Sequence, residues 1–91
     1  MRTLVMISRA HSETAFKLAD EIHMNGEDVS IVFTGRGTHY LNRPGIMEML
    51  SFADLYTFSS EFDSPKDEVK AINYTEFVKI LEESERTFSW I

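Results

Sequence analysis

The feature that most constrains this chain is the alternation of short apolar runs with segments of helical periodicity. Runs rich in β-branched and aromatic residues occupy residues 3–7, 29–33, 54–59, 69–72 and 87–91. Between most of these runs, apolar residues recur at spacings of three and four, which is typical of amphipathic helices. Strands that alternate with helices form βαβ units around a mostly parallel sheet. The pattern predicts an α/β fold with about five strands in a mostly parallel sheet.

Two helices carry clear signals at their ends. The helix predicted over residues 13–24 has Ser12 as its N-cap and ends at Asn25-Gly26, since glycine commonly terminates helices. Asn73 and Glu76 form a capping-box-like start for a helix over residues 75–83. Weaker signals predict a helical turn at residues 38–42, a helix at residues 46–52 and a surface connection at residues 60–68.

Length, charge and composition exclude several classes of protein. The 91 residues make one domain, residues 1–91, with a formal charge of -6, so we expect no direct binding to nucleic acid. The chain has no cysteine, which excludes disulfides, thiol nucleophiles and cysteine metal sites. No apolar run approaches the roughly 18 residues that span a bilayer, and the first residues lack the features of a signal peptide. We expect a cytoplasmic protein without a membrane partner.

The loops that follow the first two predicted strands are the candidate ligand site. Because ligands of open α/β folds bind beyond the carboxyl ends of the strands, polar residues of both loops would converge there. Hydroxyls, cationic or titratable side chains and free N–H groups at helix starts would suit an anion. The alternative is that these loops are polar only because they are loops, and that the glycines supply backbone freedom. The candidate residues are Ser8, Arg9, His11, Thr34, Gly35, Arg36, Gly37 and His39.

Other kinds of site have little support in the sequence. The histidines are not spaced to share a helix face, and no nucleophile elbow, calcium loop or complete nucleotide fingerprint is present. We therefore expect no metal, no cofactor and no catalytic residue. The surplus of methionine and aromatic residues predicts either a subunit interface or simple core filling. The candidate interface residues are Tyr40, Met47, Tyr56 and Trp90.

The C-terminal third resembles the end of the DsrH/TusB proteins. Its segment Ile72-Asn73-Tyr74-Thr75-Glu76-Phe77-Val78 is followed by a helix and then by Phe88-Ser89-Trp90-Ile91. The family pattern is roughly I-D-Y-T-D-F-V, a short helix and a final S-W or A-W. In addition, Phe33-Thr34-Gly35-Arg36-Gly37 is similar to the end of the second strand in the wider DsrE-like superfamily.

This resemblance implies a three-layer α/β/α domain with a mostly parallel, five-stranded sheet. It also implies hetero-oligomers with DsrE/TusD-like and DsrF/TusC-like subunits that pass persulfide sulfur, for 2-thiolation of the wobble uridine of transfer RNA or for sulfur oxidation. Because the chain lacks cysteine, it would be a subunit that does not itself carry persulfide.

Three functions stay open at this point. The first is a non-catalytic DsrH/TusB-like subunit of a sulfur-relay complex. The second is a stand-alone, self-associating DsrE-like domain that binds a small anion. The third is an enzyme that works without a metal or a cysteine.

Overall fold

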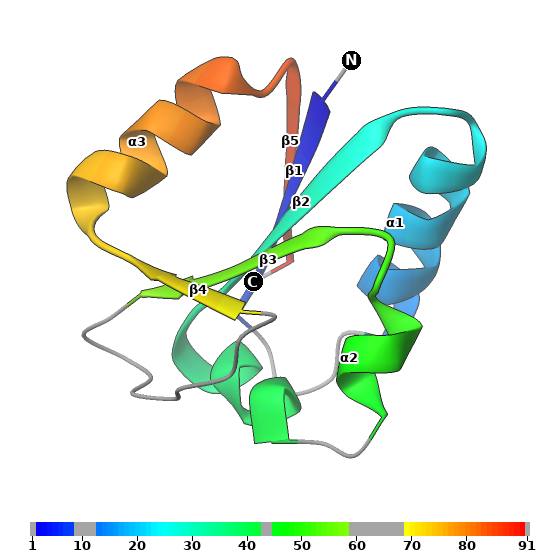
Figure 1. Ribbon diagram of the computed structural model, residues 1–91, viewed down its shortest axis with the longest axis horizontal. Coiled ribbons are helices and arrows are strands. Elements are labelled where there is room, and N and C mark those ends of the chain that lie inside the picture. The colour runs from blue at the N-terminus through cyan, green and yellow to red at the C-terminus, as the bar shows by residue number, and fades with distance from the viewer. Residues whose placement is uncertain (1, 9–12, 43–44, 59–68, 91) are drawn as a thin grey trace.

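Strands and helices alternate along the chain in nearly the predicted order (Figure 1). The computed structural model describes residues 2–8, 13–42, 45–58 and 69–90, without the side chains of Met47 and Trp90. The elements are β1 (Arg2–Ile7), α1 (Glu13–Met24), β2 (Asp28–Phe33), the 3-10 helix η1 (Gly35–Asn42), α2 (Ile46–Met49), β3 (Asp54–Phe58), β4 (Val69–Ile72), α3 (Tyr74–Glu83) and β5 (Arg86–Trp90).

The five strands form one sheet in the order β4-β3-β2-β1-β5. Every neighbouring pair is parallel. The first strand, β1, therefore lies between β2 and the last strand, β5. The predicted α/β class and its parallel sheet are confirmed, and all four strand pairs are parallel rather than most of them.

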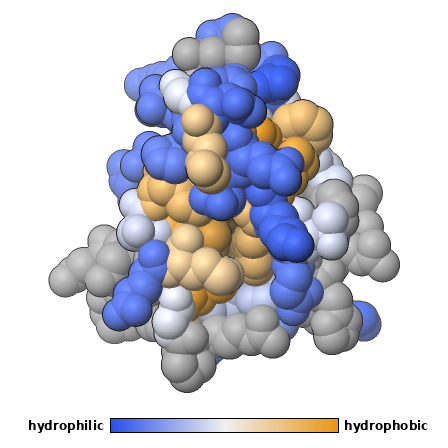
Figure 2. Space-filling view, turned by 90° about the vertical axis from the view of Figure 1, so that its right-hand side faces the viewer, coloured by the Kyte–Doolittle hydropathy of each residue, from blue (hydrophilic) through white to orange (hydrophobic). Residues whose placement is uncertain are grey.

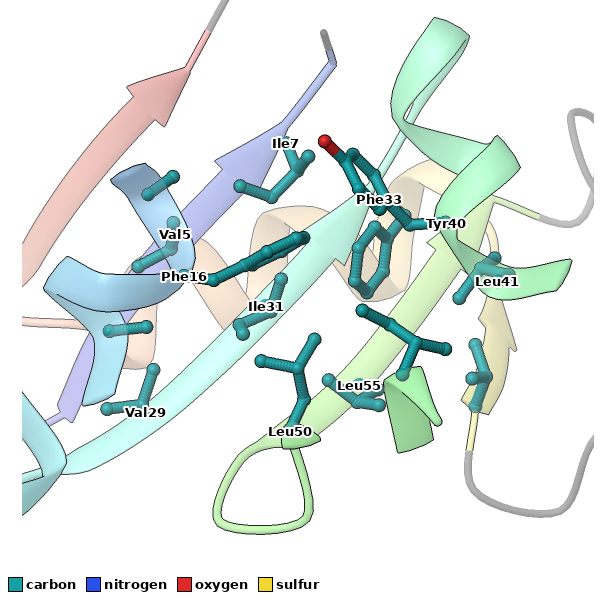
Figure 3. Packing of buried hydrophobic residues seen from close by; sticks show 14 of the residues in the cluster. Val5, Ile7, Phe16, Val29, Ile31, Phe33, Tyr40, Leu41, Leu50 and Leu55 are labelled. Carbon is teal, nitrogen blue, oxygen red and sulfur yellow. The ribbon is translucent and has the colours of Figure 1, made fainter. Parts of the chain in front are cut away.

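The larger core lies between the sheet and the layer formed by α1, η1 and α2 (Figure 3). Alternate residues of the strands point into this layer, as the two-residue period of a strand requires. At its centre the ring of Phe16 meets Tyr40 edge-on, with centroids 4.9 Å apart and planes at 83°. The same ring lies 6.2 Å from that of Phe33. This aromatic cluster joins α1, β2 and η1.

The opposite face of the sheet is covered by α3, which makes the fold a three-layer α/β/α arrangement (Figure 1). Leu4, Val32 and Ile72 are buried on this face. Phe77 of α3 packs on Phe58 of β3, with ring centroids 5.3 Å apart. None of the α3 residues is fully buried, so this layer is thinner than the one on the other side.

The predicted capping box at the start of α3 is confirmed. The Asn73 side chain accepts a hydrogen bond of 2.8 Å from the backbone N–H of Glu76. The Glu76 side chain in turn accepts one of 3.2 Å from the backbone N–H of Asn73. The N-cap predicted at Ser12 lies outside the described residues.

Two helix boundaries differ from the prediction. The helix expected over residues 46–52 ends at Met49, because the chain turns at Leu50 toward β3, and Ala53 N–H donates to the Leu50 carbonyl. The helical turn expected at residues 38–42 begins earlier, at Gly35. The glycine-flanked segment after β2 is thus the first turn of a helix rather than an irregular loop.

Candidate functional site

The carboxyl ends of β1 and β2 meet directly. Thr34, which follows β2, donates its backbone N–H to the carbonyl of Ile7, the last residue of β1, at 2.9 Å. Ser8 comes next, and its carbonyl oxygen lies 3.7 Å from where a Cβ atom on Gly35 would stand. The predicted convergence of the two loops is confirmed for Ser8 and residues 34–37.

Both glycines of this segment have structural reasons to be glycine. Gly35 has a φ of 54°, in the left-handed region that favours glycine. Gly37 is buried, and a Cβ atom there would overlap the carbonyl oxygen of Ile7 and lie 2.7 Å from its carbonyl carbon. The close approach of η1 to β1 therefore depends on Gly37, whether or not a ligand binds.

Polar side chains of η1 stand at the surface beside this contact. Thr38 Oγ1 donates a hydrogen bond of 2.8 Å to the carbonyl of Gly35. Arg36 and His39 are exposed, and the His39 ring lies 4.3 Å from that of Tyr40. Within the described part of the chain, the Arg36 side chain has no ion pair or hydrogen bond. Its guanidinium is open to an anion there.

Of the remaining predicted ligand and interface residues, the structure describes only the side chains of Tyr40 and Tyr56. Arg9 and His11 lie outside the described residues, and so do the side chains of Met47 and Trp90. Tyr40 is completely buried in the core. This placement follows the core-filling alternative and corrects the expectation of an interface role for its side chain.

Tyr56, the last candidate interface residue, is half-buried on the α3 face. It borders a cavity of about 230 Å³ beneath α3, which Lys70 and Glu83 also line. Burial, followed by the charge of Asp54, raises the pKa of Tyr56 above 10.0. Arg2, whose guanidinium lies 3.9 Å from the Asp54 carboxylate, opposes this rise. The phenol therefore stays protonated, and able to donate a hydrogen bond, to a higher pH than an ordinary tyrosine.

A larger hollow lies between α1 and α2 on the other side of the molecule (Figure 2). Figure 2 shows apolar side chains gathered in the middle of this face between hydrophilic ones. The hollow measures about 510 Å³ and is lined by Glu13, Thr14, Phe16, Lys17, Asp20, Met49, Leu50 and Phe52. The sequence analysis did not predict this hollow. The one feature of the sequence that pointed to it was the surplus of methionines, which includes the half-exposed Met49.

The residues present limit the chemistry of the chain. It has no cysteine, so no thiol can carry sulfur on it. Residues 2–8, 13–42, 45–58 and 69–90 contain no group of three or more histidine or acidic side chains placed to hold a metal ion. Among these residues, no helix is long and apolar enough to cross a membrane.

A solved structure places this architecture among known folds. The YchN protein of E. coli superimposes on the chain with a TM-score of 0.76, over 98% of this chain and 97% of that one. The chain has the fold of YchN. The identity over this match is 13%, so the similarity concerns the fold alone, and it agrees with the predicted α/β architecture with a parallel sheet. No protein-family model and no curated protein matches the sequence.

Proposed function

We propose that this chain is a non-catalytic, DsrH/TusB-like subunit of a sulfur-relay complex, serving 2-thiolation of transfer RNA or sulfur oxidation. The observation that carries the proposal is the fold of YchN, built from a sequence that has no cysteine and whose C-terminal third resembles DsrH/TusB proteins. A chain of this kind has no group on which persulfide could form. Its contribution to a relay would be the surfaces that hold cysteine-bearing partners in place.

The DsrH/TusB assignment rests on the sequence resemblance at the C-terminal third, and the residues of that segment have a structural role. Asn73 and Glu76 of that segment cap α3, and Phe77 packs α3 on Phe58. The segment therefore sets how α3 lies on the sheet. Tyr74 and Leu81 of the same helix remain 73% and 38% exposed. Exposed apolar groups on a thinly packed layer are suitable contacts for another subunit.

Affinity capture from the source cells tests this proposal. The tagged full chain is isolated under native conditions, its mass is determined, and every co-purifying chain is identified. We expect DsrE/TusD-like and DsrF/TusC-like chains, at least one with a reactive cysteine, in a defined ratio. A Tyr74→Lys variant should reduce this capture if α3 contacts the partners, whereas Met24→Lys, on α1, should not. Recovery of the chain without such partners contradicts the proposal.

One observation favours a second function, the binding of a small anion at the carboxyl edge of the sheet. Ser8 lies against residues 34–37, and the exposed Arg36 has no partner within the described residues. An arginine guanidinium recognises phosphate and carboxylate groups well. The site would hold an anion at the surface, since Arg36 and Gly35 are exposed.

Thermal unfolding with inorganic phosphate or sulfate at constant ionic strength tests this second function. The anion should raise the melting temperature of the wild type, and Arg36→Ala should abolish the rise. Arg86→Ala is the matched control, because Arg86 already bonds Glu27 and lies at the start of β5, away from the carboxyl edge. A rise that survives in Arg36→Ala rules out this loop as the site.

A further inference from the structure

The outer edge of β5 has no partner strand among the described residues, and we propose that it pairs antiparallel with β5 of a second copy of this chain to form a two-fold dimer. Within the described residues, β5 ends the sheet and pairs with β1 alone. Such an edge presents backbone N–H and C=O groups that another strand can bond. The proposal is independent of the sulfur-relay function, because it concerns copies of this chain only.

Strand register identifies the backbone groups on this edge. Ile7 accepts a hydrogen bond from Thr34, so its carbonyl points toward β2. In a parallel sheet, two residues in register direct their N–H and C=O groups toward the same edge of the sheet. Trp90 is in register with Ile7, so its backbone N–H and C=O point from β5 toward β1. Alternation along the strand then directs the N–H and C=O groups of Thr87 and Ser89 outward.

A register centred on Phe88 satisfies all of these outward groups. Antiparallel pairing about this centre places Thr87 of each copy opposite Ser89 of the other, where they exchange hydrogen bonds. The two Phe88 residues become direct neighbours, and the ring of each is half-buried against the core of its own chain. Arg86 falls opposite position 90, which is a tryptophan, so no two like charges meet.

The other edge of the sheet carries a lysine, whereas β5 carries none. The edge strand β4 carries Lys70, which is exposed and lies 3.8 Å from the Glu76 carboxylate. Lysine on an edge strand disfavours pairing with another chain. The one charged residue of β5, Arg86, is bonded at 2.6 Å to Glu27 of its own chain. The remaining residues of β5 are uncharged.

The helices leave room for a second sheet. The main helix contacts of the sheet are those of α1 with β1 and β2 and of α3 with β1. Neither α1 nor α3 therefore has its main contacts on β5. A partner strand beside β5 would extend the sheet into one of ten strands with matching helix layers on each face.

Light scattering of the purified full chain during size exclusion tests the dimer. The wild type should have twice the 10.5 kDa mass of one chain. Phe88→Lys and Phe88→Glu should each be monomeric, because like charges then face each other across the two-fold axis. An equal mixture of the two variants should form the dimer again, since lysine then faces glutamate. Circular dichroism of each variant monitors its fold.

Two controls separate this edge from other exposed apolar groups. Met24→Lys and Met49→Lys add the same charge at residues that are 77% and 54% exposed but lie on α1 and α2, and both should remain dimeric. The proposal is overturned by a monomeric wild type, by a dimer that Met49→Lys abolishes and Phe88→Lys leaves intact, or by a mixture of the two Phe88 variants that stays monomeric.

Discussion

Gly37 packs so closely on Ile7 that no Cβ atom fits between them. A Cβ atom there would overlap the Ile7 carbonyl oxygen and lie 3.0 Å from the Ile7 side chain. The contact joins η1 to the end of β1, so the position of every η1 side chain at the carboxyl edge depends on it.

Gly37→Ala should therefore push η1 away from β1 and lower the free energy of unfolding by about 1–3 kcal/mol, as overpacking commonly does. Urea unfolding measures this loss. Gly45→Asn is the control, because nothing lies within 4 Å of the added Cβ atom and asparagine tolerates the left-handed φ of 80°. A Gly37→Ala protein as stable as the wild type contradicts the packing described.

Removing the N-cap of α3 should destabilise the protein. The helix has ten residues and none of them is fully buried, so its ends matter more than in a well-packed helix. Asn73→Ala should lower the free energy of unfolding by about 1 kcal/mol. Asn73→Asp should retain most of the stability that the wild-type cap provides. Thr75→Ala, at an exposed position of the same turn, is the control and should have a much smaller effect.

The raised pKa of Tyr56 predicts a loss of stability at high pH. The folded state holds the phenol proton more tightly than the unfolded state, so the stabilisation is fully present below the ordinary pKa of 10.0. It disappears as the pH rises through the folded pKa. Tyr56→Phe should flatten the fall in unfolding free energy between about pH 9 and about pH 11. Asp54→Asn removes the second cause of the raised pKa, so it should make this fall in unfolding free energy smaller without abolishing it.

Replacing a buried hydroxyl should stabilise the chain. Thr3 is fully buried in β1, and its Oγ1 has no hydrogen-bond partner among the described residues. Since an unsatisfied buried hydroxyl is costly, Thr3→Val should raise the free energy of unfolding by about 1 kcal/mol. Thr87→Val, at an exposed position of β5, is the control and should change the free energy of unfolding little. A lower stability of Thr3→Val would show that the hydroxyl bonds a partner and would contradict the prediction.

Sequence patterns predicted most helices and strands well, because the interactions that begin and end these elements involve residues close together in the sequence. The helix at residues 13–24 and the Asn73 capping box depend on residues within a few positions of each other, and both agree with the structure. The early end of α2 was not predictable in this way. Its apolar stripe continues through Leu50, which is buried as expected, but the chain must leave the helix there to reach β3.

The candidate site was predictable only in part. Parallel strands bring their carboxyl ends to one edge, which is why Ser8 and residues 34–37 meet as expected. The burial of Tyr40 and Gly37 follows from contacts with residues distant in sequence, Phe16 and Ile7. No periodicity within residues 35–42 encodes those contacts. No local pattern encodes the strand order either.

The place of β1 in the sheet has a consequence for the growing chain. This strand is synthesised before the other described strands, yet one of its two neighbours is β5, at residues 86–90. Until β5 is synthesised, one side of β1 lacks its partner strand. Such pairing between distant segments slows folding and exposes strand edges in the meantime. We therefore expect the nascent chain to acquire its cooperative fold late, after nearly all of the described residues have been translated.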